Sequence, residues 1–388
     1  MRETYILGIG ATAVGEHYGL SLSDLGSEAL RNAVTNAGSG LDHERIGALY
    51  VANALSETMA SQSHLGPLMA DAVGLTGIEA LRIEAAGASG GVALRQALLA
   101  VASGTHDCVV VLGVEKITDR LDGALEAALA IATHSDHEAD QGITLTAQWA
   151  MLMRRYMYEH GYEAAAFAPF PINAHANGAK TPGALYRFAI NADKYRKANQ
   201  IASPLNMLDC STVSDGAAAI VIASGNIARE LSGSHVRIAG SALATDTLGV
   251  ANRRDPLWLG AVERSTQAAL RQAGCTHQDV DVLELTDPHG ITAALALEAG
   301  GFVARGQAPR YAADGGIGIE GATPLATAGG YKARGDIAGA SGIYQAVELV
   351  RQLRGQAGAT QVKNARIGLA QNIGGIGATV VTHLLVAE

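Results

Sequence analysis

The segment 82–103, RIEAAGASGGVALRQALLAVAS, has a pattern typical of a buried strand, a tight turn and a helix. Small residues from Gly87 to Gly91 form the turn, and apolar residues then recur at helical spacing. The first N–H groups of such a helix point toward whatever lies at the turn. In many hydrolases and acyltransferases the nucleophile occupies this apex, beside a site for an oxyanion. Here the apex is Gly87, which has no side chain to react.

The cysteines and a histidine-rich segment are the other candidates for reactive chemistry. Cys108, Cys210 and Cys275 are far apart and form no CxxC pair, which predicts neither a disulfide framework nor a zinc knuckle. None of them lies at the turn, and Cys108 belongs to an apolar, strand-like segment. His134 and His137 stand among acidic residues, but the composition is typical of a polar loop, so no metal site is expected.

The elements that must position the turn follow an α/β pattern. With 388 residues, 47 of them glycine, the chain is long enough for two medium domains built from layers joined by tight turns. We predict that Ser23 or Asp24 caps the first helix. The pattern predicts strands at 5–10, 46–52, 108–114, 217–223, 236–242 and 280–285, and helices at 21–37, 61–73, 147–159, 261–273 and 291–299.

The turn and its helix occur twice in the chain. GASGGVALRQALLAVASG begins at Gly87 and GASGIYQAVELVRQLRG begins at Gly339, and each is followed by a strand-like segment, DCVVVLGV or ARIGLAQNI. A repeat of this kind predicts two related α/β halves, 1–225 and 226–388. The segment of about 115–206 has a looser pattern, and we interpret it as a loop or cap domain inserted in the first half, where specificity often resides.

Charge and hydropathy exclude several classes of protein. The net charge of −9 and the pI of about 5.7 argue against a nucleic-acid surface, which would need clustered Lys and Arg. No apolar run is long enough to cross a bilayer, and the N-terminus has no secretory pattern. We therefore expect a soluble, cytoplasmic protein.

Several long blocks in the chain resemble the thiolase superfamily, in particular the sterol-carrier-protein-type and archaeal acetoacetyl-CoA thiolases. The resemblance implies the five-layered αβαβα fold, built from two βαβαβαββ halves with a loop domain inserted in the first, and a homodimer. The blocks that carry it are VGEHYGLSLSDL, RIEAAGASGGVALRQA, LGVEKITD, LDCSTVSDGAAAIVIAS, GGYKARGDIAGASG and QNIGGIGATVVTHLL.

The positions that carry catalysis in that family differ here. Gly87 stands where active thiolases have the cysteine nucleophile. A motif similar to His-Asp-Cys-Phe falls on Thr286-Asp287-Pro288-His289, which retains only the aspartate. The Gly-His-Pro motif reads Gly335-Asp336-Ile337, whereas Gln371-Asn372-Ile373-Gly374-Gly375 is nearly intact. Because glycine cannot hold an acyl group, acyl transfer through a cysteine is not expected.

One interpretation is carbon–carbon cleavage of a β-hydroxyacyl-CoA by a retro-aldol reaction, which needs a base and donors to a thioester enolate but no covalent intermediate. Thiolase-like aldolases that act on steroid side-chain CoA esters also lack the cysteine, although they have tyrosines at the positions of Thr286 and Asp336. The candidate catalytic residues are Asp336 as the base, His289, Asn372 and Tyr331. The candidate substrate-binding residues are Gly87, Thr286, Asp287, Gly374 and Gly375.

Structural interpretations stand beside these functional ones. Asp336 can instead cap the helix that follows Gly339 or pair with Arg334, and Tyr331 can be a packing residue. For His289 the preferred interpretation is a solvated turn residue, and for Asp287 it is a helix N-cap. The whole chain can also be a non-catalytic subunit that pairs with an active thiolase or binds acyl-CoA.

The resemblance also suggests partners. It implies a small OB-fold protein with a zinc ribbon that helps to form the acyl-CoA channel. Coenzyme A is expected as part of the substrate, with no other cofactor, no nucleic acid and no membrane.

Overall fold

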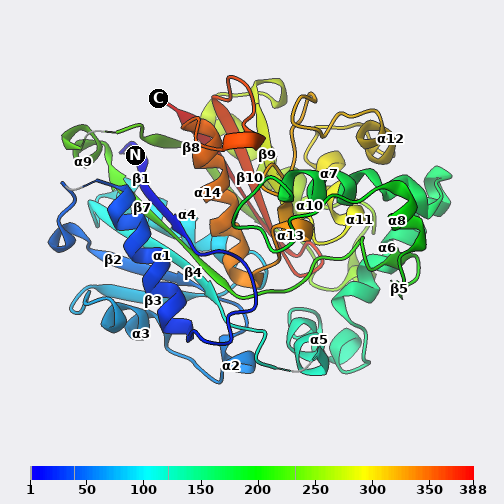
Figure 1. Ribbon diagram of the computed structural model, residues 1–388, viewed down its shortest axis with the longest axis horizontal. Coiled ribbons are helices and arrows are strands. Elements are labelled where there is room, and N and C mark those ends of the chain that lie inside the picture. The colour runs from blue at the N-terminus through cyan, green and yellow to red at the C-terminus, as the bar shows by residue number, and fades with distance from the viewer. Residues whose placement is uncertain (1, 39, 121, 232) are drawn as a thin grey trace.

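A computed structural model of the chain describes residues 2–38, 40–120, 122–231 and 233–388. Its centre is a nine-stranded mixed sheet whose N-terminal and C-terminal parts join where Tyr5 pairs with Arg237 and Ile6 with Val236 (Figure 1). The strand order is β3 (Glu79–Ile83), β2 (Ala48–Ala52), β4 (Cys108–Glu115), β7 (Gly216–Ser224), β1 (Thr4–Ala11), β8 (Val236–Thr245), β11 (Thr379–Ala387), β10 (Ile367–Gly374) and β9 (Val282–Leu285).

Helices pack on the outer faces of both parts of the sheet and also between them. Helices α1 (Leu22–Asn36) and α3 (Leu65–Ala72) cover the outer face of the N-terminal part, and α10 (Gly260–Ala273) and α11 (Gly290–Ala299) cover that of the C-terminal part. Between the two parts lie α4 (Ser89–Ser103) and α14 (Ser341–Leu353), and α14 is at the centre of Figure 1.

Strand β4 illustrates how the sequence produces these layers. All eight of its residues are buried, so its side chains, which point alternately to opposite faces, must be covered on both. Val109 and Val111 pack with α4 and α14, whereas Val110 and Leu112 pack with α1. Two outer cores and a middle core that surrounds α4 and α14 hold the five layers together, which confirms the fold predicted from the sequence.

The internal repeat is visible in the details of the two turns. Ser89 Oγ accepts a hydrogen bond from the backbone N–H of Ala85, and Ser341 Oγ accepts one from Ile337, each at 2.9 Å. The two helices that begin at these serines cross in direct backbone contact. A Cβ atom on Gly90 would lie 2.9 Å from the backbone N of Gly342, which leaves no room for a side chain there.

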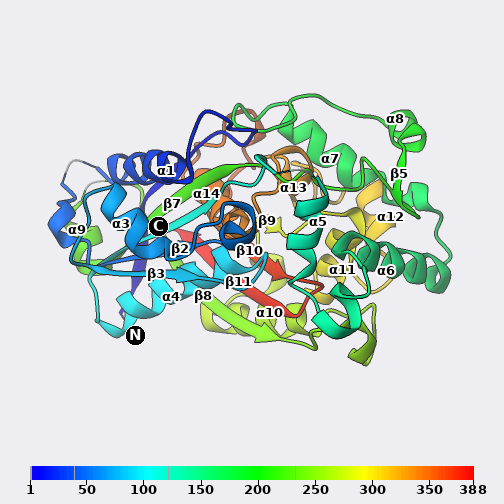
Figure 2. The same ribbon diagram turned by 90° about the horizontal axis from the view of Figure 1, so that it is seen from below.

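The segment predicted as a cap contains helices α5 (Asp122–Ala130), α6 (Leu145–His160), α7 (Pro169–Gly178) and α8 (Ala192–Lys197) and the two-stranded sheet of β5 (Gln200–Ala202) and β6 (Leu205–Asn206). Figure 2 shows α5 and α6 beside α11, at the end of the molecule away from α3. The predicted division at residue 225 falls at the start of α9 (Gly225–Glu230), between β7 and β8.

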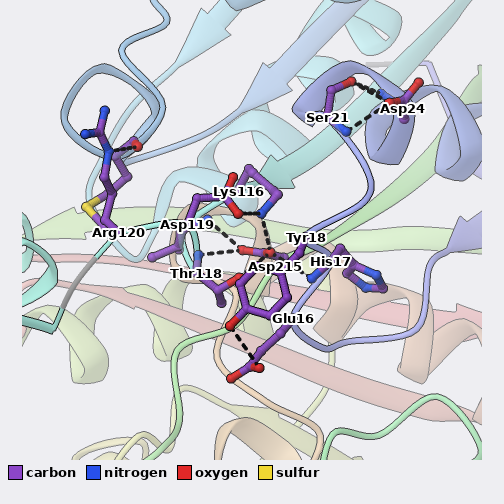
Figure 3. A network of polar contacts seen from close by, with 12 residues as sticks. Glu16, His17, Tyr18, Ser21, Asp24, Lys116, Thr118, Asp119, Arg120 and Asp215 are labelled. Atoms are coloured by element: carbon purple, nitrogen blue, oxygen red, sulfur yellow. Dashed lines mark hydrogen bonds and ion pairs between the residues drawn. The ribbon is translucent and has the colours of Figure 1, made fainter.

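Asp215, which is fully buried, fixes the point where the chain leaves β4 for the cap (Figure 3). Its carboxylate accepts hydrogen bonds from the backbone N–H groups of Ile117 and Thr118 and forms an ion pair with Lys116 at 2.8 Å. It also accepts a bond from the backbone N–H of His17. Burial alone would raise the pKa of Asp215, but these donors hold it below the ordinary value.

Two predicted helix starts were wrong. The first helix is capped by Ser21, whose Oγ accepts from the N–H of Asp24, while the Asp24 carboxylate accepts from the N–H of Ser21. Asp24 is thus the third residue of a capping box and not the cap. The next predicted helix, α3, begins at Leu65 because Ser61 and His64 have positive φ angles. Among the described residues, no helix is long and apolar enough to cross a membrane.

Candidate active site

A cavity of about 340 Å³ lies between the glycine turn, the ends of the C-terminal strands and the cap. Gly87, Thr286, His289, Tyr331 and Asp336 come from segments far apart in the chain, and all of them line it. Gly375 also lines it, so six of the nine predicted site residues meet at one cavity. The cap contributes a largely apolar wall that includes Ala128, Leu129, Ile131, Ala132, Leu145 and Trp149.

The turn at Gly87 is strained and tightly enclosed. Ala86 has a φ of +51°, and Ser89 Oγ donates a 2.6 Å hydrogen bond to its carbonyl oxygen. A Cβ atom on Gly87 would lie 2.8 Å from the carbonyl oxygen of Ile373, closer than a carbon atom can normally approach. The backbone of this chain therefore has no place for a side chain where a nucleophile would stand.

Gly374 lies against this turn and not in the cavity wall. A Cβ atom on it would be 2.4 Å from the carbonyl oxygen of Ala85, so glycine is needed for the close packing of β10 on the turn. The sequence predicted that Gly374 contacts the substrate, but in the structure it contacts the backbone of the turn.

Tyr331, on the short helix α13 (Gly330–Ala333), is held by two polar neighbours. Asn372 Nδ2 donates to the tyrosine oxygen at 3.0 Å, and Thr286 Oγ1 lies 3.2 Å from it. Because Asn372 supplies a donor to this oxygen, the tyrosine O–H remains available to donate to Thr286 or to a ligand. Burial raises the pKa of Tyr331, which keeps the phenol protonated at neutral pH.

Asn372 is fully buried behind Tyr331 and does not line the cavity. Its Oδ1 accepts from the backbone N–H of Gly91 at 2.9 Å, and its Nδ2 contacts Thr286 and Tyr331. Its side chain is thus occupied by other protein groups. Its contacts indicate that it positions Tyr331 and α4, whereas the sequence made it a candidate catalytic residue.

Asp336 is a partly exposed carboxylate in the cavity wall. Its oxygens accept hydrogen bonds from Ser211 Oγ at 3.1 Å, from the N–H of Ala338 at 3.0 Å and from Ser341 Oγ at 3.3 Å. The last two contacts lie at the start of α14, so Asp336 has a capping contact and also faces the cavity. Burial raises its pKa despite these donors. It forms no ion pair with Arg334 within 4 Å among the described residues.

His289 is buried, which overturns its interpretation as a solvated turn residue. Only 5% of it is exposed, and its ring centre is 6.3 Å from that of Trp149 in the cap. Burial, together with the charge of nearby Lys332, lowers the pKa of His289 to about 3. The imidazole is neutral at physiological pH, so one ring nitrogen carries a proton that it can donate and the other can accept a hydrogen bond.

Asp287 is not an N-cap, because residue 289 occupies the N-cap position of α11. The Asp287 carboxylate accepts the backbone N–H of Tyr331 at 2.8 Å and lies 3.9 Å from Lys332 Nζ. It is buried and absent from the cavity wall, so it fixes α13 and has no contact with a ligand in the cavity. The sequence could not show this because the partner N–H is 44 residues away.

Cys210, which the sequence placed away from the turn, lines the same cavity as Gly87. It lies in the wall next to Ser211, which donates to Asp336. Burial raises the pKa of its thiol to about 12, and the charge of Asp209 acts in the same direction. Such a thiol is protonated at neutral pH and is a poor nucleophile. Its place in the block LDCSTVSDG was the signal that could have found it.

The cavity has little positive charge of its own. Among the described residues that line it, Arg82 is the only one with a permanent positive charge, and it pairs with Glu57 at 2.7 Å. No group of three His, Cys, Asp or Glu side chains in the described part of the chain could hold a metal ion.

Comparison with known proteins places this geometry in a family. Residues 4–226 match the family model described as "Thiolase, N-terminal domain", and residues 242–387 match "Thiolase C-terminal domain-like". The chain is 40% identical to an acetyl-CoA acetyltransferase of Methanothermobacter thermautotrophicus, with 99% of both chains covered. It is 29% identical to a steroid side-chain-cleaving aldolase of Thermomonospora curvata, over 89% of this chain and 90% of the aldolase.

Among solved structures, the Ltp2-ChsH2(DUF35) aldolase superposes with a TM-score of 0.86 at 26% identity, over 99% of this chain and 98% of that one. With both halves matched and relatives aligned end to end, this chain belongs to the thiolase family.

Proposed function

We propose that this protein cleaves a carbon–carbon bond in an acyl-CoA thioester without a covalent acyl-enzyme, by a retro-aldol reaction of a β-hydroxyacyl-CoA. The observation that carries the proposal is the enclosed turn at Gly87. A Cβ atom there would meet the Ile373 oxygen at 2.8 Å, while a carboxylate, a phenol and an imidazole line the same cavity. These groups suit proton transfer and enolate stabilisation.

Asp336 is the proposed base. It takes the proton of the β-hydroxyl group, the bond between Cα and Cβ breaks, and Cβ leaves as the carbon of an aldehyde or ketone. The electron pair of that bond moves into the thioester as an enolate. The protonated Asp336 then returns the proton to Cα, which gives a shorter acyl-CoA and restores the carboxylate. The raised pKa of Asp336 makes it a stronger base than an ordinary aspartate.

Tyr331 and the neutral His289 are the proposed donors to the enolate and to the departing carbonyl oxygen. Both line the cavity, and the Tyr331 oxygen already accepts from Asn372, so its own proton can point to the substrate. Gly87 contributes a backbone N–H just before α4, near the end of the helix where the dipole favours negative charge.

The proposal extends to a protein partner. The cavity wall offers only the paired Arg82 to the phosphates of coenzyme A among the described residues, so a partner that supplies basic groups is favoured. The likeness to the Ltp2-ChsH2(DUF35) aldolase supports an OB-fold partner of the DUF35 kind. A homodimer stays a prediction of the sequence.

The test is turnover of a panel of β-hydroxyacyl-CoA esters by the purified chain, alone and with a DUF35-type partner, followed by liquid chromatography and mass spectrometry. We expect a shorter acyl-CoA and an aldehyde or ketone in equal amounts, and loss of both products in Asp336→Asn. Asp314→Asn is the matched control, because Asp314 is exposed and lies outside the cavity wall.

Two results would contradict the proposal. Cleavage of acetoacetyl-CoA that requires free coenzyme A and disappears in Cys210→Ala would assign acyl transfer to Cys210, in line with the 40% identical acetyltransferase. Absence of turnover with every ester and partner, together with tight binding to an active thiolase, would assign the chain the role of a non-catalytic subunit.

A further inference from the structure

A second cavity, of about 380 Å³, is lined in part by Arg334 and shares no lining residue with the first. We call it the arginine cavity. Its wall comes from the end of β1, the chain after α7, α14 and the segment after α14. The charged or hydroxyl-bearing residues in the wall are Thr12, Lys180, Thr181, Arg334, Tyr344, Glu348, Arg351 and Thr360.

Arg334 forms the floor of this cavity and has an unusual environment. Only 2% of the residue is exposed, and none of its three guanidinium nitrogens has a hydrogen-bond partner among the described residues. The guanidinium lies between two aromatic rings, 5.5 Å from the centre of Tyr331 and 5.4 Å from that of Tyr344. Ring contacts offset part of the cost of burying this charge, but an unpaired buried cation still favours a nearby anion.

The other charges of the arginine cavity leave an excess of positive charge. Arg351 forms an ion pair with Glu348 at 2.8 Å, so these two charges offset each other. Lys180 is exposed, and its ammonium group has no ion pair in the described part of the chain. Among the residues that line the cavity, Lys180 and Arg334 therefore leave a net charge of about +2, and outside the wall Asp287 and Asp336 act on the charge of Arg334.

We propose that the arginine cavity is a binding site for the phosphate group of a small phosphate monoester. Two positive charges match the nearly dianionic phosphate at neutral pH. The volume of 380 Å³ lies in the range of small-molecule sites and exceeds what a bare ion needs. Lys180 at the rim contacts the phosphate, while Arg334, whose nitrogens are covered, attracts it by its charge. The hydroxyl groups of Thr181 and Thr360 already donate to the carbonyl oxygens of Asn177 and Ala357.

The test is isothermal titration calorimetry of the full chain with inorganic phosphate, glycerol 3-phosphate and glycerol at constant ionic strength. We expect both phosphates to bind, glycerol 3-phosphate more tightly, and glycerol not to bind. Lys180→Ala should weaken the binding of glycerol 3-phosphate about tenfold, because it removes a charge-assisted contact. Lys194→Ala is the matched control, since Lys194 is an exposed lysine on α8 outside the cavity.

Arg351→Ala provides a second, independent variant, because it leaves the Glu348 carboxylate unpaired at the cavity and should also weaken binding. Failure of both phosphates to bind at millimolar concentration would overturn the proposal, and so would equal affinity in Lys180→Ala and Lys194→Ala. Binding of inorganic phosphate as tight as that of glycerol 3-phosphate would refute the claim that the organic part is recognised. The measurement needs no turnover, so its outcome is independent of the retro-aldol proposal.

Discussion

Restoring a cysteine at position 87 tests the central structural argument. In Gly87→Cys, the new Cβ would lie 2.8 Å from the Ile373 carbonyl oxygen, and its next neighbours would be backbone atoms of residues 373 and 374 at 3.9 and 4.0 Å. Backbone cannot rotate away as a flexible side chain can, so β10 or the turn must shift. Overpacking of this kind typically costs about 1–3 kcal/mol. We therefore expect the variant to be less stable by about that amount and to gain no acyl-transfer activity.

Two assays check this expectation. Urea titration compares the free energy of unfolding of Gly87→Cys with that of Gly19→Cys, whose added Cβ would have no atom within 4 Å. Intact-mass spectrometry after incubation with acetyl-CoA or acetoacetyl-CoA detects any acyl group on the new thiol. A variant that equals Gly19→Cys in stability and becomes acylated would refute the reasoning, because the turn would then accept a nucleophile without displacement.

Three further predictions concern groups held by other contacts. Tyr331→Phe should lower kcat/KM for retro-aldol cleavage by about 10²-fold or more, since it removes a proton donor. Tyr18→Phe, at a residue that is 67% exposed, should leave kcat/KM unchanged. An equal loss in both variants would exclude a specific role for Tyr331. The rate of cleavage should fall as the pH drops through the raised pKa of Asp336, because the base must be ionised. His289, with a pKa of about 3, stays neutral and should add no further change to the pH–rate profile near neutrality. A rate that is independent of pH on the acid side would exclude Asp336 as the base. Asp215→Asn should cost about 1–3 kcal/mol at neutral pH in urea titration, because Lys116 loses its buried partner and keeps only the half-exposed Asp119. The pKa of Asp215 is lowered in the folded state, so its contribution is present above the ordinary value and should disappear as the pH falls below about 4; a cost that persists in acid would contradict the electrostatic origin.

The layered fold was predictable because its signals are local and repeated. The apolar run 108–114 in β4 and the two GASG turns each carry their own local pattern, and the structure places them as expected. Where helices begin was harder to predict. Ser21, Ser23 and Asp24 are all plausible caps by residue type, and only the reciprocal bonds between Ser21 and Asp24 decide among them.

The candidate site was predictable as a set but not in its inner arrangement. The family blocks brought Gly87, Tyr331 and Asp336 to one cavity. They could not show that Asn372 and Asp287 face away from it, because that depends on bonds to Gly91 and Tyr331 from other parts of the chain. The burial of His289 also depends on a distant part of the chain. Trp149 of the cap covers this histidine, although its local sequence resembles an exposed turn.

The crossing of α4 and α14 at Gly90 and Gly342 has a consequence for how a substrate enters. With backbone packed on backbone, the two halves cannot slide or rotate against each other without breaking contact at the middle of the molecule. Relative motion of the two halves is therefore a costly way to admit a long thioester to the cavity. Within the cap, α6 is built into the C-terminal core through Trp149, Met153 and Tyr156, whereas α5 packs in a small separate cluster through Ala128. Displacement of α5 is therefore the less costly way to open the cavity, and the residence time of a product should depend on that motion.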